Sequence, residues 1–404
     1  MEIINGGVCA AKGFLAAGLH CGIRKSRTKR DIALIFSKVP ASAAAVYTTN
    51  KVKGAPITVT KNNLQNGVAQ AIICNSGNAN TCNANGIEIA ERTCGLVADA
   101  LNISKDDVVV ASTGVIGQKM SITPFEEGIP LLAKALNENG SADAAEAIMT
   151  TDTKMKEIAV SFTVGTKECR IGGIAKGSGM IHPNMATMLV FITTDCNISP
   201  EMLSLALKED VDKSFNMISV DGDTSTNDML SILANGLAEN EKITDTGADF
   251  EAFKEALSAV TTYLCRAIAK DGEGATKLIE CTVSGAKDDS AAKTIAKSVI
   301  CSSLVKAAMF GADANWGRVL CAIGYSGAEV DVTGVGVRFA SDAGEVLVCE
   351  RGAGVDFSEE IAKEVLSKDE IKILVTLSDG NAAATAFGCD LTYEYVKING
   401  DYRT

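Results

Sequence analysis

The sequence predicts a mixed α/β protein, of the α/β or α+β class, on three observations. Apolar or β-branched runs bounded by glycine, asparagine or serine alternate with segments whose apolar residues repeat at helical spacing. Hydrophobic residues make up 47% of the chain and charged residues 22%, which is typical of a globular protein. The length of 404 residues suits two or three domains of roughly 150 residues, or one large layered domain.

The first third of the chain predicts buried strands separated by helices. Ile89, Cys94, Val97 and Leu101 recur at helical spacing and predict a helix over 87–101. A second helix is expected over 130–136. The expected strands cover 31–36, 44–48, 71–74 and 108–111.

The remainder predicts a hairpin, further helices and a strand-rich end. A turn at Gly165 joins the two strands of the hairpin. Ser199 followed by Pro200 is an N-cap and first-turn proline, and opens a helix to about Lys213. No internal repeat is visible, and one soft break between lobes is expected near 311–318. The other expected elements are the hairpin strands 157–164 and 169–174, a strand over 187–194, helices over 250–269, 291–309 and 358–366, and short strands from 325 onward.

The composition excludes several classes of function. The net charge of -12 repels phosphate backbones and argues against a nucleic-acid partner. No apolar run reaches the ~18–20 residues of a membrane span, and the start lacks a basic signal-peptide region, so a cytoplasmic protein without a membrane partner is expected. The 13 cysteines are scattered without a C-x-x-C pair, which predicts no disulfide framework and no zinc site. With two histidines, a three-histidine metal site is excluded, and a small-molecule enzyme fits best.

The segment 175–187 (AKGSGMIHPNMAT) is a polar, glycine-bearing loop that runs into a buried-looking strand. Such a loop is a place for function, although a long connection between strands explains the pattern equally well. A phosphate-binding loop needs Gly-Lys-Ser/Thr, whereas the order here is Lys176, Gly177, Ser178. His182 either orients this loop or is structural.

The segment 221–228 (DGDTSTND) has three aspartates and invites comparison with a calcium loop. The bidentate glutamate expected at the twelfth position is replaced by Ser231, so a structural turn or a wall of the site is the better interpretation.

Segment 176–187 resembles the self-cleavage and nucleophile segment of the ornithine acetyltransferases, also called glutamate N-acetyltransferases, of arginine biosynthesis. The similarity covers nearly the whole chain, with the family's motifs in the same order. These motifs are KGF at 12–14, YTTN at 47–50, NSGNAN at 75–80, STGVIG at 112–117, MTTDT at 149–153, SVDGDTSTND at 219–228, DGEGAT at 271–276 and NWGR at 315–318. Ala314 stands where the family pattern has a proline before Asn315.

The resemblance implies a layered αββα-type sandwich, shared with self-processing aminopeptidases, with a smaller C-terminal α/β lobe. It also implies self-cleavage between Ala186 and Thr187, giving an α chain of residues 1–186 and a β chain of 187–404 that assemble as α2β2.

The chemistry of Thr187 is consistent with that implication. A threonine hydroxyl has no base of its own, but cleavage gives the same residue an α-amine with a pKa of about 7.7–8.0, which can accept the hydroxyl proton near neutral pH. Without the resemblance, Thr187 would be a β-branched residue at the start of a strand.

The resemblance assigns the other site residues by position. Thr113 and Gly114 would stabilise the oxyanion of the acyl intermediate, whereas the residues alone indicate a strand-ending turn. A carboxylate of the substrate would bind Lys176, and the ornithine ammonium would bind Glu273; a lone lysine or glutamate is otherwise a surface residue. The remaining substrate contacts would be Thr150 or Thr153, with Thr150 favoured, Thr187, Asn399 and Thr404.

The implied reaction moves acetyl from N2-acetylornithine to glutamate by a ping-pong route through acetyl-Thr187. No metal or other cofactor is implied, because the acyl donor is an amide; acetyl-CoA is an alternative donor in some members of the family. Two rival functions remain: an N-terminal-nucleophile amidohydrolase or aminopeptidase with water as the acceptor, and an unprocessed, non-catalytic protein that binds amino acids.

Overall fold

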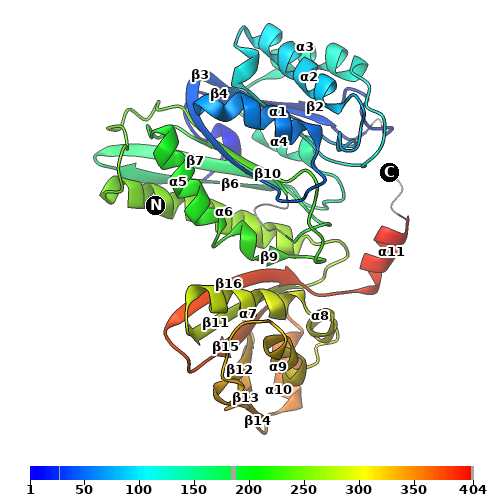
Figure 1. Ribbon diagram of the computed structural model, residues 1–404, viewed down its shortest axis with the longest axis vertical. Coiled ribbons are helices and arrows are strands. Elements are labelled where there is room, and N and C mark those ends of the chain that lie inside the picture. Colours follow the sequence, from blue (N-terminus) through cyan, green and yellow to red (C-terminus); the bar gives the residue numbers. More distant parts are fainter. Residues whose placement is uncertain (27, 183–187, 402–404) are drawn as a thin grey trace.

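The computed structural model describes residues 1–26, 28–182 and 188–401, so that the predicted site residues Ala186, Thr187 and Thr404 lie outside the described residues. The described part of the first 270 residues forms one large sheet and the six α-helices that pack around it (Figure 1). The strands of this sheet are β1 (Glu2–Ile4), β2 (Phe14–Leu19), β3 (Ile32–Tyr47), β4 (Val68–Asn75), β5 (Val108–Ser112), β6 (Lys156–Val164), β7 (Lys167–Lys176), β8 (Leu189–Thr194) and β10 (Met229–Ala234). The helices are α1 (Ala55–Asn63), α2 (Gly86–Leu101), α3 (Thr123–Ala135), α4 (Ser141–Ile148), α5 (Pro200–Val211) and α6 (Ala248–Lys270).

Strand β3 divides this sheet into two layers. The strand order is β1-β6-β7-β8-β10-β3-β4-β5, with β2 also paired to β3. The second half of the 16-residue β3 pairs with β10, and its first half pairs with β2 and β4. The register of the β3–β4 pair shifts between Phe36 and Ala41, where β3 passes from one half to the other.

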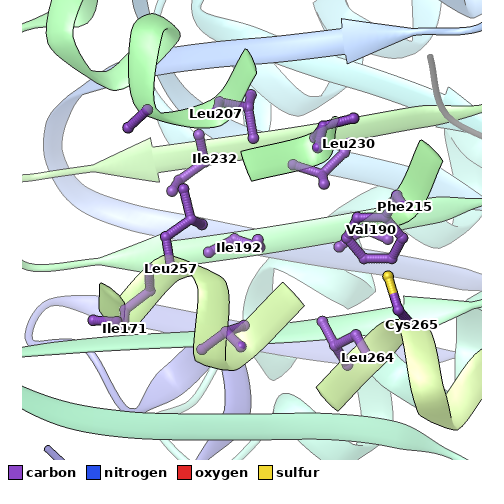
Figure 2. Packing of buried hydrophobic residues seen from close by; sticks show 14 of the residues in the cluster. Ile171, Val190, Ile192, Leu207, Phe215, Leu230, Ile232, Leu257, Leu264 and Cys265 are labelled. Carbon is purple, nitrogen blue, oxygen red and sulfur yellow. The ribbon is translucent and has the colours of Figure 1, made fainter. Parts of the chain in front are cut away.

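Side-chain alternation shows that the two halves face each other. In β8, Leu189 and Phe191 share a buried cluster with Ile35 of β3 and Ile72 of β4, so this cluster lies between the layers. The alternate β8 residues Val190 and Ile192 pack on α5 and α6 on the outer side (Figure 2).

The other half of the sheet has the same arrangement. Leu34 of β3, Ile73 of β4 and Val110 of β5 point outward and pack with residues of α2 and α3. The order of layers is therefore α5 and α6, a sheet, a second sheet, then α2 and α3, which confirms the predicted αββα sandwich.

A second, smaller lobe is built mostly from residues after α6 and contains a seven-stranded sheet of order β14-β13-β12-β15-β11-β16-β9, in which only the short β9 comes from before α6 (Figure 1). Its strands are β9 (Ile218–Ser219), β11 (Leu278–Ala286), β12 (Gly336–Ser341), β13 (Gly344–Glu350), β14 (Ala353–Gly354), β15 (Glu370–Thr376) and β16 (Ala382–Cys389). Its helices are α7 (Asp289–Cys301), α8 (Ser303–Phe310), α9 (Trp316–Gly324) and α10 (Glu359–Leu366). The expected break near 311–318 falls inside this lobe, between α8 and α9; the chain passes from the first lobe to the second earlier, at residues 271–277.

The last helix, α11 (Tyr393–Asp401), stands apart from the rest of the second lobe (Figure 1). Gly274, in the segment that joins the two lobes, lies against its backbone, because a Cβ on Gly274 would be 2.7 Å from the amide nitrogen of Tyr395. No helix among residues 1–26, 28–182 and 188–401 has the length and apolarity that crossing a membrane requires.

Three expectations about elements need correction. The strands expected over 31–36 and 44–48 are one strand, β3. Pro40 does not interrupt this strand because it lies at the register shift, where the ladder needs no hydrogen bond from its backbone nitrogen. The helix expected over 130–136 begins at Thr123 and contains Pro130, which is exposed, so the carbonyl group left without its helical donor can bond to water. The helix expected over 291–309 is two helices, because the hydroxyl of Ser302 accepts from the amide of Val305 and caps α8.

Candidate active site

The candidate active site is a cavity of about 240 Å³ in the first lobe, at the ends of its strands and against α11, with both polar and apolar residues in its lining. Six of the sequence-predicted residues line it, and they come from five separate parts of the chain. They are Thr113 and Gly114 after β5, Thr150 before β6, Lys176 at the end of β7, Glu273 after α6 and Asn399 on α11. We refer to this space as the site cavity.

Gly114 allows two loops to meet at one wall of the site cavity. Its φ is +129°, and a Cβ there would lie 2.3 Å from the carbonyl carbon of Gly77 and 2.5 Å from the amide nitrogen of Asn78. The same two segments are also joined by a hydrogen bond, in which the amide of Thr113 donates to the carbonyl of Asn75 at 2.9 Å. This turn fixes Thr113 at the cavity wall with a hydroxyl and a backbone N–H available nearby, the donor types that an oxyanion requires.

A buried ion network that the sequence analysis missed supports another wall. The ammonium of Lys156 lies 2.7 Å from Oδ1 of Asp152 and 2.6 Å from Oδ2 of Asp271, and all three side chains are buried. Asp152 also accepts from the amides of Thr150 at 3.0 Å and Gly177 at 2.7 Å. The network therefore fixes the positions of Thr150 and of the residue that follows Lys176.

Charge accounts for the ionised state of Asp152. Burial alone would raise its pKa, but the positive charges of Lys176 and Lys156 and the hydrogen bonds to Lys156 and Thr150 hold the pKa of the Asp152 carboxyl well below its usual value. Lys176 is itself 8% exposed and makes no ion pair within 4.0 Å among the described residues. Its ammonium is thus a buried positive charge in the wall of the site cavity.

Thr150 and Thr153, the two threonines considered as substrate contacts, have different surroundings. Thr150 lines the site cavity, whereas Thr153 is not among the lining residues. The hydroxyl and the amide of Thr153 both donate to the carboxylate of Asp271. Thr153 therefore belongs to the supporting network, whereas Thr150, the favoured candidate, lines the cavity together with its neighbour Thr151.

Glu273 is held from two directions. The side-chain amide of Asn399 donates to its Oε2 at 2.8 Å, and its backbone amide donates to the carbonyl of Ser178 at 2.9 Å. The carboxylate passes so close to Gly179 that a Cβ there would lie 2.4 Å from it. Glu273 thus combines a fixed position with a negative charge, as a partner for an ammonium group requires.

Residues 183–187 lie outside the described residues, but the chain on either side of them is anchored. The carboxylate of Asp221 accepts from the amides of Met180 at 2.6 Å and Ile181 at 2.8 Å. On the other side, the carbonyl of Met188 accepts from the amide of Met229 at 2.9 Å. The aspartate of the 221–228 segment therefore binds backbone amides next to the site. Met180 also lines the cavity, so the flank that precedes residue 183 reaches this space.

His182 lies beside the second lobe and is not among the residues that line the site cavity. Its Nδ1 is 3.1 Å from the hydroxyl of Ser219 and 3.5 Å from Sγ of Cys301. Burial lowers the pKa of His182 to about 4, with a further contribution from the positive charge of Lys297. The side chain is therefore neutral near pH 7.

The fold is a layered α/β sandwich, and its candidate active site is a cavity lined by a buried lysine, Lys176, and a buried glutamate, Glu273. Comparison with known proteins identifies the group: the chain belongs to the ArgJ family, whose model matches residues 15–404.

Curated relatives match over the full length of the chain. It is 50% identical over 405 residues to the arginine biosynthesis bifunctional protein ArgJ of Caldanaerobacter subterraneus, and 51% identical over 406 residues to that of Symbiobacterium thermophilum, with 100% of both chains covered in each case. A crystal structure of the Bacillus halodurans protein of the same name is 47% identical with a TM-score of 0.50, over 53% of this chain and 98% of that chain.

Proposed function

We propose that this protein transfers the acetyl group of N2-acetylornithine to glutamate, releasing ornithine and forming N-acetylglutamate. The observation that carries the proposal is that Lys176 and Glu273 both line the site cavity of an ArgJ family member. Acetylornithine offers its carboxylate to the ammonium of Lys176 and its side-chain ammonium to the carboxylate of Glu273.

The nucleophile in this proposal is Thr187, after cleavage of the Ala186–Thr187 bond. The hydroxyl oxygen attacks the carbonyl carbon of Ala186, the acyl group moves from nitrogen to oxygen, and water hydrolyses the resulting ester. The freed α-amine of Thr187 then serves as the base for its own hydroxyl, in place of the histidine of other acyl transferases. His182 does not take that role, because its side chain lies outside the residues that line the cavity.

Acetyl transfer then proceeds in two halves. The Thr187 hydroxyl attacks the acetyl carbonyl of acetylornithine, the amine of ornithine leaves with a proton, and acetyl-Thr187 remains. The amine of glutamate attacks this ester and regenerates the hydroxyl. The hydroxyl of Thr113 and the backbone N–H of Gly114 stabilise the oxyanion in each half, a contribution of about 2.7–4 kcal/mol for one donor.

The proposal also covers the cofactor requirement, the assembly of the chains and one further substrate contact. The acyl donor is an amide and the nucleophile is part of the chain, so no metal or organic cofactor is assigned; acetyl-CoA is an alternative donor for synthesis of acetylglutamate. The α and β chains stay together because the αββα layers combine strands from both sides of residue 187, and the proposed assembly is α2β2. Thr404 is proposed as a further substrate contact, from the same end of the chain as Asn399.

One experiment separates the proposal from its rivals. Purified protein is analysed by denaturing mass spectrometry and then incubated with acetylornithine and glutamate. We expect two chains, divided after Ala186, and formation of N-acetylglutamate; Thr187→Val should give one 42.0 kDa chain without activity. Free acetate without acetylglutamate would indicate an amidohydrolase, and an uncut, inactive wild-type chain would indicate a binding protein.

A further inference from the structure

A second cavity, of about 350 Å³, adjoins the site cavity and contains three basic side chains. Gly114, Thr150 and Thr151 line both cavities, so the two spaces lie on either side of these residues. Arg24, Lys25 and Lys29 supply the positive charges, from the loop between β2 and β3. We refer to this space as the basic cavity. In a chain with a net charge of -12, such a concentration of positive charge needs an explanation.

The guanidinium of Arg24 is fixed at the boundary with the site cavity. Its Nη2 donates to the carbonyl of Met149, the residue before Thr150, and its amide donates to Asp31 at 3.0 Å. The stem of the side chain crosses Gly77, where a Cβ would be 2.7 Å from Cγ of Arg24. The position of this charge therefore depends on the same loops that build the wall around Thr150.

Lys25 and Lys29 are exposed, and neither forms an ion pair with the described residues. On the same loop, by contrast, Arg30 forms ion pairs with Asp143 and Glu146. The two lysines thus leave the charge of the basic cavity uncompensated within the described residues, and an anionic ligand would gain from it.

The basic cavity offers positive charge for the one substrate side chain of the proposed reaction that Glu273 would repel. Ornithine and glutamate have side chains of opposite charge, and a glutamate side chain directed at Glu273 would bring two carboxylates together. The Asn399 amide donates to Glu273 and leaves no positive charge there. Among the described residues that line the site cavity, Lys176 is the one lysine or arginine, and it is needed for the α-carboxylate.

Resting on the proposed function, we propose that the basic cavity binds the side-chain carboxylate of the acceptor glutamate. In this arrangement acetylornithine directs its side chain toward Glu273, and glutamate directs its side chain past Gly114 and Thr150 toward Arg24, Lys25 and Lys29. The two substrates share the α-carboxylate contact and the acyl position. Their oppositely charged side chains bind in two different cavities.

The test compares glutamate with glutamine, which has the same shape without the charge. In Lys25→Gln/Lys29→Gln we expect KM for glutamate to rise about five- to tenfold, KM for acetylornithine to stay within twofold, and the preference for glutamate over glutamine to fall. Arg24→Gln should change the same ratio further. The control is Lys105→Gln, an exposed lysine at the opposite end of β5 from Thr113, which should leave every value unchanged.

Other results would overturn the assignment. An unchanged glutamate-to-glutamine ratio in both variants would remove it. A rise in KM for acetyl-CoA alone would assign the basic cavity to the phosphate groups of that donor, against our proposal. Calorimetric titration of glutamate into wild type and double variant measures binding without turnover. If wild type fails to release ornithine from acetylornithine, the proposed function fails, whereas weaker glutamate binding by the double variant would still identify the cavity.

Discussion

The ammonium of Lys156 lies 2.6 Å from a carboxylate oxygen of Asp271, and both side chains are shielded from solvent. Lys156 belongs to β6, and Asp271 follows α6, so the pair joins two elements that are distant in the sequence. The hydroxyl of Ser178 donates to the Asp271 carbonyl at 2.6 Å, and Asp152 links the same lysine to Gly177. Through this pair the fold holds the segments that contain Thr150, Lys176 and Glu273 in one arrangement.

We expect Lys156→Met to destabilise the protein by about 3–5 kcal/mol, because it leaves two carboxylates buried without their cation. Urea unfolding measures the change. Lys154→Met is the control: its side chain is exposed, and the change should stay within about 0.5 kcal/mol. Similar unfolding free energies for the two variants would mean that the network does not hold the site.

Local patterns predicted much of the fold. The hairpin of β6 and β7 is confirmed because two apolar runs flank the tight turn at Gly165. The start of α5 is confirmed, with the Ser199 hydroxyl accepting from the amide of Met202. The length of β3 was not predicted, because its single strand changes partners halfway and Pro40 resembles a strand end.

The candidate site depended on information of a different kind. Thr113 and Lys176 each follow a predicted strand, but their meeting with Glu273 and Asn399 is tertiary and was expected only from the family resemblance. Lys156 gave no signal, since a lysine in a strand usually faces solvent. Asp152 and Asp271 stood inside the quoted motifs 149–153 and 271–276, and their buried, paired state could be found only in the folded chain.

Gly114→Ala should lower the rate of acetyl transfer by about 100-fold, the effect of a displacement of roughly 1 Å in an active site. The added Cβ meets backbone atoms of Gly77 and Asn78, which are unable to turn away as a flexible side chain would. Gly95→Ala, on α2 with open space around it, should leave the rate unchanged and stabilise the chain by about 0.5–1 kcal/mol. Equal rates for both variants would argue against a role for the 114 turn.

Glu273→Gln should raise KM for acetylornithine about 5- to 10-fold, because a charge-assisted hydrogen bond of about 1.5–3 kcal/mol is reduced to a neutral one of about 0.5–1.5 kcal/mol. Steady-state kinetics at saturating glutamate provide the measurement. Glu255→Gln, an exposed position on α6, serves as the control and should leave KM unchanged. Unaltered acetylornithine affinity in Glu273→Gln would withdraw Glu273 as the partner of the ornithine side chain.

Asp210, a buried carboxyl on α5, should make stability depend on pH. Burial raises its pKa from 3.8 to about 6, while the hydroxyl of Ser214 donates to it at 3.1 Å. The folded state therefore binds more protons than the unfolded state between these values, and stability falls as pH rises from about 4 through 6.

Asp210→Asn should remove this dependence, since the amide resembles the protonated carboxyl in shape and charge. At pH 8 the variant should be more stable than wild type by up to roughly 3 kcal/mol, from about 1.36 kcal/mol for each pKa unit, and at pH 4 the two should differ little. Urea unfolding at pH 4, 6 and 8 tests this, with the exposed Asp99→Asn on α2 as the control. A difference that stays constant across pH would show that the Asp210 carboxyl titrates as it does in the unfolded chain.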